Sequence, residues 1–214
     1  MSVQIAIAQI QINPGQRVTL DDISWSEFEA ILEELGEHRH SHIAYYQGVL
    51  EFRMPLPGHE RAKVIIGDLI KILLDELELE WESLGSTTFK RQTMQAGIEP
   101  DDCFYIRNYA AVIGKQRLDL EIDPVPDLAI EVDLTSFTQT SAYRGLGIPE
   151  LWRIDQGRLE IWVLENGQYQ SVFQSKLFPN LPILEGFSLF LGKSQDKPVS
   201  ALRREFKQWL QDYL

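Results

Sequence analysis

Apolar residues recur at helical spacing in several stretches of the chain. The first such stretch starts after Ser24 or Ser26, each followed three residues later by a glutamate as in a capping box, and it ends at Gly36. We expect a short helix there. The same spacing predicts three further helices, a long amphipathic one at residues 59–81, one that includes residues 143–146 and is ended by Gly147, and a terminal one at residues 199–213.

Branched and aromatic residues dominate the segments between these helices. In residues 43–54 they flank Gln47-Gly48, a dipeptide suited to a tight turn, so a β-hairpin is expected. Residues 151–173 show the same pattern with turns at Gly157 and Gly167. Further short strands are predicted at residues 87–92, 102–106 and 127–134, and a brief helix after Asn108. This order of elements indicates an α/β or α+β fold.

The strand predicted at residues 127–134 has two unlike faces, because successive side chains alternate. One face carries Leu128, Ile130, Val132 and Leu134, and the other carries Asp127, Ala129, Glu131 and Asp133. An acidic strand face usually lies open to water. Three carboxylates on one face repel one another, however, and a bound cation is the alternative that offsets this repulsion.

The bulk composition fits one large domain, because 214 residues can bury a sizeable core. The apolar N-terminal segment is interrupted by glutamines and has no basic flank, so no secretion signal is predicted. No run approaches the roughly 18 apolar residues of a membrane span. A single cysteine, Cys103, excludes a disulfide framework and a cysteine-rich zinc site. We therefore expect a cytoplasmic protein.

The formal net charge of −12 argues against a broad basic surface for nucleic acid, because lysine and arginine supply most of the affinity for phosphate. It leaves room for a local contact at which a divalent metal neutralises acidic side chains. His38, His40 and His42 alternate and could bind zinc together on a strand, but no fourth ligand accompanies them. The chain lacks the motifs of phosphate-binding loops, serine esterases and zinc proteases.

Three motifs in a fixed order give the chain a family resemblance. They are residues 99–108 (Glu-Pro-Asp-Asp-Cys-Phe-Tyr-Ile-Arg-Asn), residues 126–136 (Pro-Asp-Leu-Ala-Ile-Glu-Val-Asp-Leu-Thr-Ser) and residues 143–155 (Tyr-Arg-Gly-Leu-Gly-Ile-Pro-Glu-Leu-Trp-Arg-Ile-Asp). Together they resemble the Uma family of bacterial proteins regarded as endonucleases, a restriction-endonuclease-like branch of the PD-(D/E)xK superfamily. The resemblance implies a mixed β-sheet flanked by helices and a nuclease that hydrolyses DNA phosphodiester bonds.

The extent of the resemblance suggests how the single domain is organised. It covers residues 42 to about 173, which implies a nuclease-like core at residues 42–175. An N-terminal extension with a helix would occupy residues 1–41, and a C-terminal extension with the terminal helix would occupy residues 176–214. A homodimer is expected, because nuclease folds of this kind commonly pair and both extensions lie outside the region of resemblance.

The resemblance also assigns a metal site. Asp101 takes the place of the superfamily aspartate, Glu131 that of the acidic residue on the following strand, and the main-chain carbonyl of Val132 would complete the coordination. These oxygen ligands suit magnesium or manganese. Glu60 is similar to an acidic residue that some members add from a helix, and it is equally well read as an exposed glutamate in the first turn of a helix.

The expected active-site lysine is absent. Two residues after the acid the chain has Asp133, and four residues before the tyrosine it has Gln139. Neither side chain carries the positive charge that balances the phosphate. Lys90 supplies this charge if it shares a face with the site, which requires Phe89 to face the core. Otherwise the protein is a catalytically inactive binding or assembly module with the nuclease fold.

Overall fold

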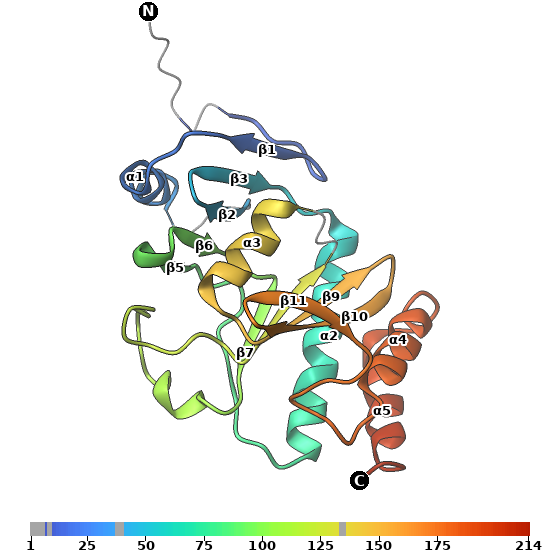
Figure 1. Cartoon of the computed structure of the whole chain (residues 1–214). Helices are drawn as coiled ribbons and strands as arrows, with labels where there is room; N and C mark the ends of the chain where they lie inside the picture. The colour runs from blue at the N-terminus through green and yellow to red at the C-terminus, as the bar shows by residue number, and fades with distance from the viewer. Residues whose placement is uncertain (1–6, 8–9, 37–40, 133–135) are drawn as a thin grey trace, which may run out of the picture.

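The computed structural model describes residue 7 and residues 10–36, 41–132 and 136–214. It contains two β-sheets, with helices around them and one helix between them (Figure 1). No helix within these described ranges is long and apolar enough to cross a membrane.

The first sheet, called sheet A, is antiparallel throughout. Its strand order is β1 (Arg17–Leu20), β3 (Val49–Arg53), β2 (His42–Tyr46), β6 (Ala96–Ile98) and β5 (Phe89–Arg91). Helix α1 (Trp25–Leu35) covers one face through Trp25, Phe28 and Ile31. The predicted capping box forms between Ser24 and Glu27, so this helix starts where its sequence signal places it.

The second sheet, called sheet B, is mixed. Its strand order is β11 (Gln168–Val172), β10 (Arg158–Glu165), β9 (Glu150–Asp155), β8 (Leu128–Val132), β7 (Asp102–Tyr105) and β4 (Glu82–Ser83). Strands β8 and β9 are parallel, and the other neighbouring pairs are antiparallel. Helix α3 (Phe137–Leu146) connects the parallel pair, because parallel neighbours need a crossover connection.

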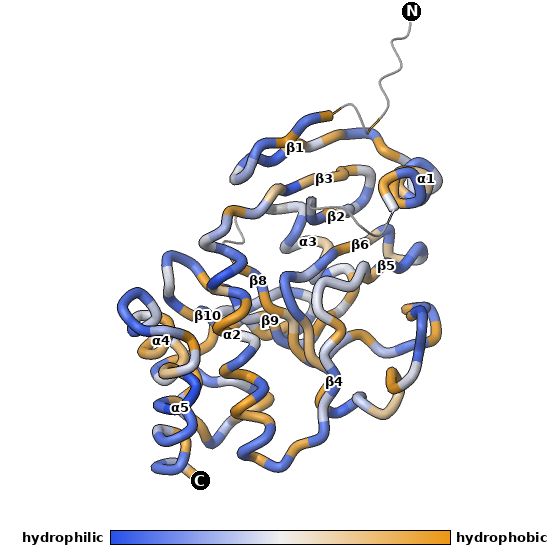
Figure 2. Tube along the Cα trace, turned by 180° about the vertical axis from the view of Figure 1, so that it is seen from behind, coloured by the Kyte–Doolittle hydropathy of each residue, from blue (hydrophilic) through white to orange (hydrophobic). Residues whose placement is uncertain are grey.

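One face of sheet B packs against three helices, α2 (Pro57–Glu76), α4 (Ile183–Lys193) and α5 (Val199–Leu210). Leu128, Ile130 and Val132 point into this core, as their alternation predicts. Figure 2 shows the hydrophobic positions of α2 beside those of β8 and β9.

Helix α3 packs between the two sheets. Its residues Ala142, Tyr143 and Leu146 share a core with Ala44 of sheet A and Ala129 of sheet B. The face of β8 that carries Glu131 is therefore buried against α3, so of the two readings of this acidic face the one in which it lies open to water does not hold.

The structure confirms most of the predicted elements and differs from the prediction in several places. The hairpins form with turns at residues 47–48, 156–157 and 166–167. The long helix ends at Glu76 rather than near residue 81, because Glu78 adopts a positive φ of 53°. The brief helix after Asn108 is a 3₁₀ turn. Strands β1, β4 and β6 and helix α4 were not predicted, and the β-structure forms two sheets instead of one.

Helix α2 approaches sheet B closely at Gly67. A Cβ atom at this position would lie 2.9 Å from Oδ2 of Asp102. The Asp102 side chain is itself held, because its Oδ1 accepts hydrogen bonds from Ser83 Oγ (2.9 Å) and from the main-chain amide of Cys103 (2.8 Å). The absence of a side chain at Gly67 thus makes room for a fixed carboxylate.

We expect Gly67→Ala to destabilise the protein by about 1–3 kcal/mol, since the added methyl overpacks this contact. Gly58→Ala is the matched control in the same helix, because a Cβ there meets no atom within 4 Å. Alanine favours the helical state, so Gly58→Ala leaves stability unchanged or raises it by less than about 1 kcal/mol. Urea unfolding of both variants checks this. Equal stabilities would contradict it.

Candidate active site

Asp101 lies in the bend immediately before β7 and is clamped onto β8. Its main-chain amide donates to the carbonyl of Ile130 (3.1 Å), and its Oδ2 accepts from the amide of Val132 (2.7 Å). Both contacts continue the ladder between β7 and β8. The carboxylate is buried, and its second oxygen, Oδ1, accepts a hydrogen bond from Arg53 (3.1 Å).

Glu131 is fully buried in β8. Its Oε1 accepts a hydrogen bond from the hydroxyl of Tyr143 on α3 (2.6 Å). Helix α3, which follows β8 in the chain, therefore supplies the donor that fixes the orientation of the Glu131 side chain. The other carboxylate oxygen, Oε2, remains available to a second partner.

That partner is Arg53, at the end of β3 in sheet A. Its Nη2 lies 3.1 Å from Asp101 Oδ1 and 3.1 Å from Glu131 Oε2, and its Nη1 donates to the carbonyl oxygen of Val132 (2.9 Å). Two carboxylates and one carbonyl thus converge on one guanidinium. We call Arg53, Asp101, Glu131 and the Val132 carbonyl the Arg53 cluster.

The charges in the Arg53 cluster depend on one another. Burial lowers the pKa of Arg53, but Glu131 and Asp101 raise it further, to a value above its ordinary one, so the guanidinium stays charged. Burial, reinforced by the nearby Asp101, raises the pKa of Glu131 well above its usual range. The cluster is thus a place where negative charge is costly and a cation is favoured.

Glu51 adds a further buried carboxylate beside Arg53. The two residues are two positions apart on β3 and face the same way. The hydroxyl of Ser136 donates to Glu51 Oε2 and accepts from the amides of Thr138 and Gln139, so Ser136 also caps α3. Burial raises the pKa of Glu51. Within the described residues its Oε1 has no hydrogen-bond partner.

His42 lies opposite Arg53 in the β2–β3 hairpin. Its Nδ1 is 3.4 Å from Asp101 Oδ1, and burial lowers its pKa although Asp101 raises it, so the imidazole is neutral at pH 7. His38 and His40 lie outside the described residues. Among the residues that are described, no group of three or more His, Cys, Asp or Glu side chains is arranged to hold a metal ion.

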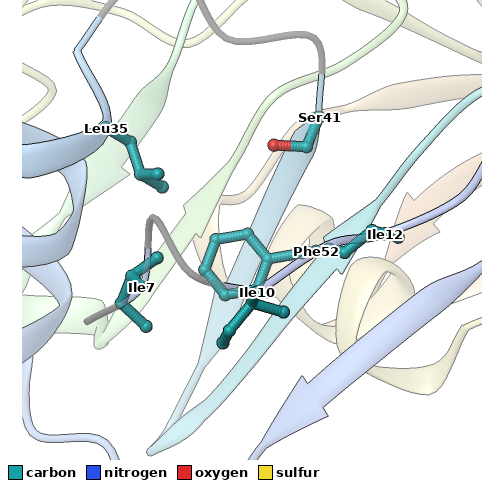
Figure 3. A pocket seen from close by; sticks show the side chains of 6 residues that line it. All are labelled: Ile7, Ile10, Ile12, Leu35, Ser41 and Phe52. Carbon is teal, nitrogen blue, oxygen red and sulfur yellow. The ribbon is translucent and has the colours of Figure 1, made fainter. Parts of the chain in front are cut away.

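A cleft of about 1080 Å³ lies beside His42. It is lined by α1, by His42 and Glu99, by Lys90 and residues 86–88, and by residues 116–118. His42 both lines this cleft and contacts Asp101, so it stands between the cleft and the cluster. A much smaller cavity of about 50 Å³ lies near α1 and β3 (Figure 3). Its lining is apolar apart from Ser41, which indicates packing rather than chemistry.

The structure does not bring Lys90 to the two carboxylates. Its Nζ forms an ion pair with Glu29 on α1 at 2.7 Å. Phe89 faces a core, as expected, but that core is the one shared with α3 and sheet B. Because neighbouring side chains on a strand alternate, Lys90 must face the α1 side of sheet A instead.

Glu60 occupies an exposed position in the first turn of α2. Its charge is near enough to raise the pKa of His42, as the smallest of the contributions to that residue. Asp127 has a structural role, since its Oδ2 accepts from the amides of Ile106, Arg107 and Asn108. Asp133 lies outside the described residues, and Gln139 is buried.

Arg53 is the residue that sequence reasoning missed. A signal was present, because Leu50 and Phe52 alternate with Glu51 and Arg53 along the predicted hairpin strand. If the apolar pair faces one core, the charged pair must share the opposite face. That this face is also buried depends on sheet B and α3, which the local pattern does not predict.

This mixed sheet flanked by helices, with one carboxylate on β8 and another directly before β7, has the restriction-endonuclease-like fold. The crystal structure of a "putative nuclease belonging to DUF820" from Anabaena variabilis ATCC 29413 matches it with a TM-score of 0.51 at 14% sequence identity. The match covers 85% of this chain and 97% of that chain, and at this identity it establishes the fold.

The chain belongs to the Uma2 family, described as "Putative restriction endonuclease", whose model matches residues 25–192. The family resemblance of the sequence motifs is thereby confirmed, and the match extends beyond residues 42–173 at both ends. A search of curated proteins finds no match.

We expect Tyr143→Phe to lower the free energy of unfolding by about 2–3 kcal/mol, because it leaves a buried carboxylate oxygen without its donor. Tyr169→Phe is the control, since the Tyr169 hydroxyl donates to the neutral carbonyl of Ile148 (2.8 Å) and its loss costs about 1 kcal/mol. Chemical denaturation at pH 7 compares the two. A smaller loss for Tyr143→Phe would show that the Glu131 contact contributes little.

Cys103 is fully buried, and burial raises the pKa of its thiol from 9.0 to about 12. We expect iodoacetamide to label it at pH 8 at least about 1000-fold more slowly in the folded protein than in denaturant, because three pKa units lower the thiolate fraction by that factor. Mass spectrometry gives both rates. Fast labelling of the folded protein would contradict the buried placement.

Proposed function

We propose that this protein is a cytoplasmic, metal-dependent endonuclease that hydrolyses phosphodiester bonds in DNA. The observation that carries the proposal is the convergence of Asp101 Oδ1, Glu131 Oε2 and the Val132 carbonyl on one positively charged group. Family membership supports the nuclease class, and the three oxygens support a cation-dependent reaction.

The three oxygens fit magnesium or manganese, because both prefer hard oxygen ligands. Bound there, a divalent metal would activate water and stabilise charge on the scissile phosphate. The chain's own residues prepare for this. The Val132 amide orients Asp101 through Oδ2, and the Tyr143 hydroxyl orients Glu131 through Oε1, so one oxygen of each carboxylate is directed to the shared position. Glu60 is retained as a candidate for an additional acidic ligand.

A second candidate function is a catalytically inactive module that binds or assembles through the nuclease fold. Two observations favour it. The position between the three oxygens is taken by Arg53, and Gln139 stands where the family often has its lysine. The net charge of −12 also limits general affinity for DNA.

Plasmid cleavage with Mg²⁺ or Mn²⁺ separates the two functions. We expect the native chain to cleave, and Asp101→Asn and Glu131→Gln each to lower the rate by at least about 100-fold, since each removes charge from the reacting centre. Both substitutions preserve side-chain shape, and circular dichroism confirms folding. Asp196→Asn, at an exposed position, serves as the control. Cleavage that survives both site substitutions would refute the assignment, and no cleavage by the native chain would favour the inactive module.

The homodimer expected from the resemblance is part of this proposal. A single chain has a mass of 24.7 kDa, so light scattering at micromolar concentration should give twice that value. A monomeric mass would remove the dimer and leave the catalytic assignment unaffected.

A further inference from the structure

The Arg53 cluster already contains a cation, and that cation belongs to the protein. The guanidinium contacts all three oxygens assigned to the metal, at distances between 2.9 and 3.1 Å. Arginine does not lose its charge at accessible pH, so the guanidinium cannot vacate this position by deprotonation. A second cation can bind to the same oxygens only if the Arg53 side chain moves away.

The Arg53 side chain also has an unused donor. It is nine-tenths buried, and within the described part of the chain its Nε has no hydrogen-bond partner, although both terminal nitrogens do. A buried, unpaired donor on a charged group is costly, and a contact made in another state of the site explains why it is kept. An anion with several oxygens would satisfy it, because the guanidinium fork matches phosphate.

The positions of the positively charged side chains show which residue can make such a contact with phosphate. The lysine of related nucleases is replaced by Asp133 and Gln139, and Lys90 is paired with Glu29 on the far face of sheet A. His42 contacts Asp101 through Nδ1, at 3.4 Å from Oδ1. Among the described side chains, Arg53 is therefore the cation that contacts both candidate carboxylates.

We propose that Arg53 supplies the positive charge that the site lacks at positions 133 and 139, moving from the three oxygens to the substrate phosphate when a divalent metal replaces it. In the metal-free protein the guanidinium holds the carboxylates together. In the loaded protein it lies beside His42, its neighbour across the hairpin, and faces the cleft that His42 lines. The phosphate contact rests on the proposed function, whereas the competition with metal does not.

Mn²⁺ binding to the full chain without DNA tests the competition. Isothermal titration should show that Arg53→Met binds Mn²⁺ at least about 10-fold more tightly than the native chain, because the competing cation is gone. Lys207→Met removes an exposed cation paired with the partly buried Glu76, and should change the affinity by less than about 2-fold. Adding Asp101→Asn to Arg53→Met should abolish the gain, which locates it at the cluster.

Arg53→Lys keeps the protein testable if Arg53→Met does not fold. Lysine retains the charge but cannot reach three oxygens with a planar fork, so its Mn²⁺ affinity should fall between those of the native chain and Arg53→Met. Mn²⁺ should also raise the melting temperature of either variant more than that of the native chain. Affinity that is unchanged or weaker in both variants would overturn the proposal.

DNA binding tests the phosphate contact. With Ca²⁺ present to prevent cleavage, a labelled duplex of about 20 base pairs should bind Arg53→Met at least about 10-fold more weakly than the native chain, and Lys207→Met within about 2-fold of it. Plasmid cleavage by Arg53→Met should fall at least about 100-fold. Tighter Mn²⁺ binding with unchanged DNA binding and cleavage would overturn the phosphate role. A native chain that neither binds nor cleaves DNA would refute the proposed function, while the Mn²⁺ result still decides the competition.

Discussion

Two buried carboxylates require a cation, and this requirement determines how the two halves of the molecule meet. Glu131 belongs to sheet B and Asp101 directly precedes strand β7 of that sheet, whereas Arg53 belongs to sheet A. The guanidinium therefore joins the sheets at the same point at which it neutralises the carboxylates. Removal of one partner from a buried ionic group leaves an uncompensated charge, which typically costs about 3–5 kcal/mol. The same ionic contact consequently sets the relative position of the sheets and the charge of the site.

Helix α3 shows how the rest of the structure serves this contact. Its first turn is capped by Ser136, which also donates to Glu51 of sheet A, and its middle carries Tyr143, which donates to Glu131 of sheet B. The helix is thus fixed by a polar contact to each sheet. Buried ionic groups can often be replaced by apolar residues without loss of stability. Their concentration here is more readily explained by function than by folding.

The sequence predicted local elements well and the meeting of distant elements less well. The capping box at Ser24 and the turn at Gly48 were predictable because each depends on a few adjacent residues. The faces of β8 followed from alternation. Whether the Glu131 face was open or covered depended on α3, and the position of Arg53 depended on how two sheets pack. Helix α4 escaped prediction, since Gly186 and Gly192 interrupt its apolar residues and its few polar residues do not form a clear polar face.

Lys90 shows, in one residue, that a local pattern does not predict how distant elements pack. The expectation that Phe89 is buried was correct. The inference that Lys90 would then face the carboxylates failed, because the core that receives Phe89 lies between the sheets, on the same side as the site. A strand in this fold has a core on each face, so knowing that one side chain is buried does not identify which core receives it.

The close approach of α2 at Gly67 determines which of two adjacent aspartates lies in the candidate site. Asp101 and Asp102 are adjacent and have the same side chain, so a slip of β7 by one residue could place Asp102 where Asp101 now lies, and the site would still contain an aspartate. The slot beside Gly67 accepts a carboxylate held by Ser83, and it faces the helix layer rather than Arg53. The glycine on the neighbouring helix thus distinguishes the two adjacent aspartates and sets the register of strand β7.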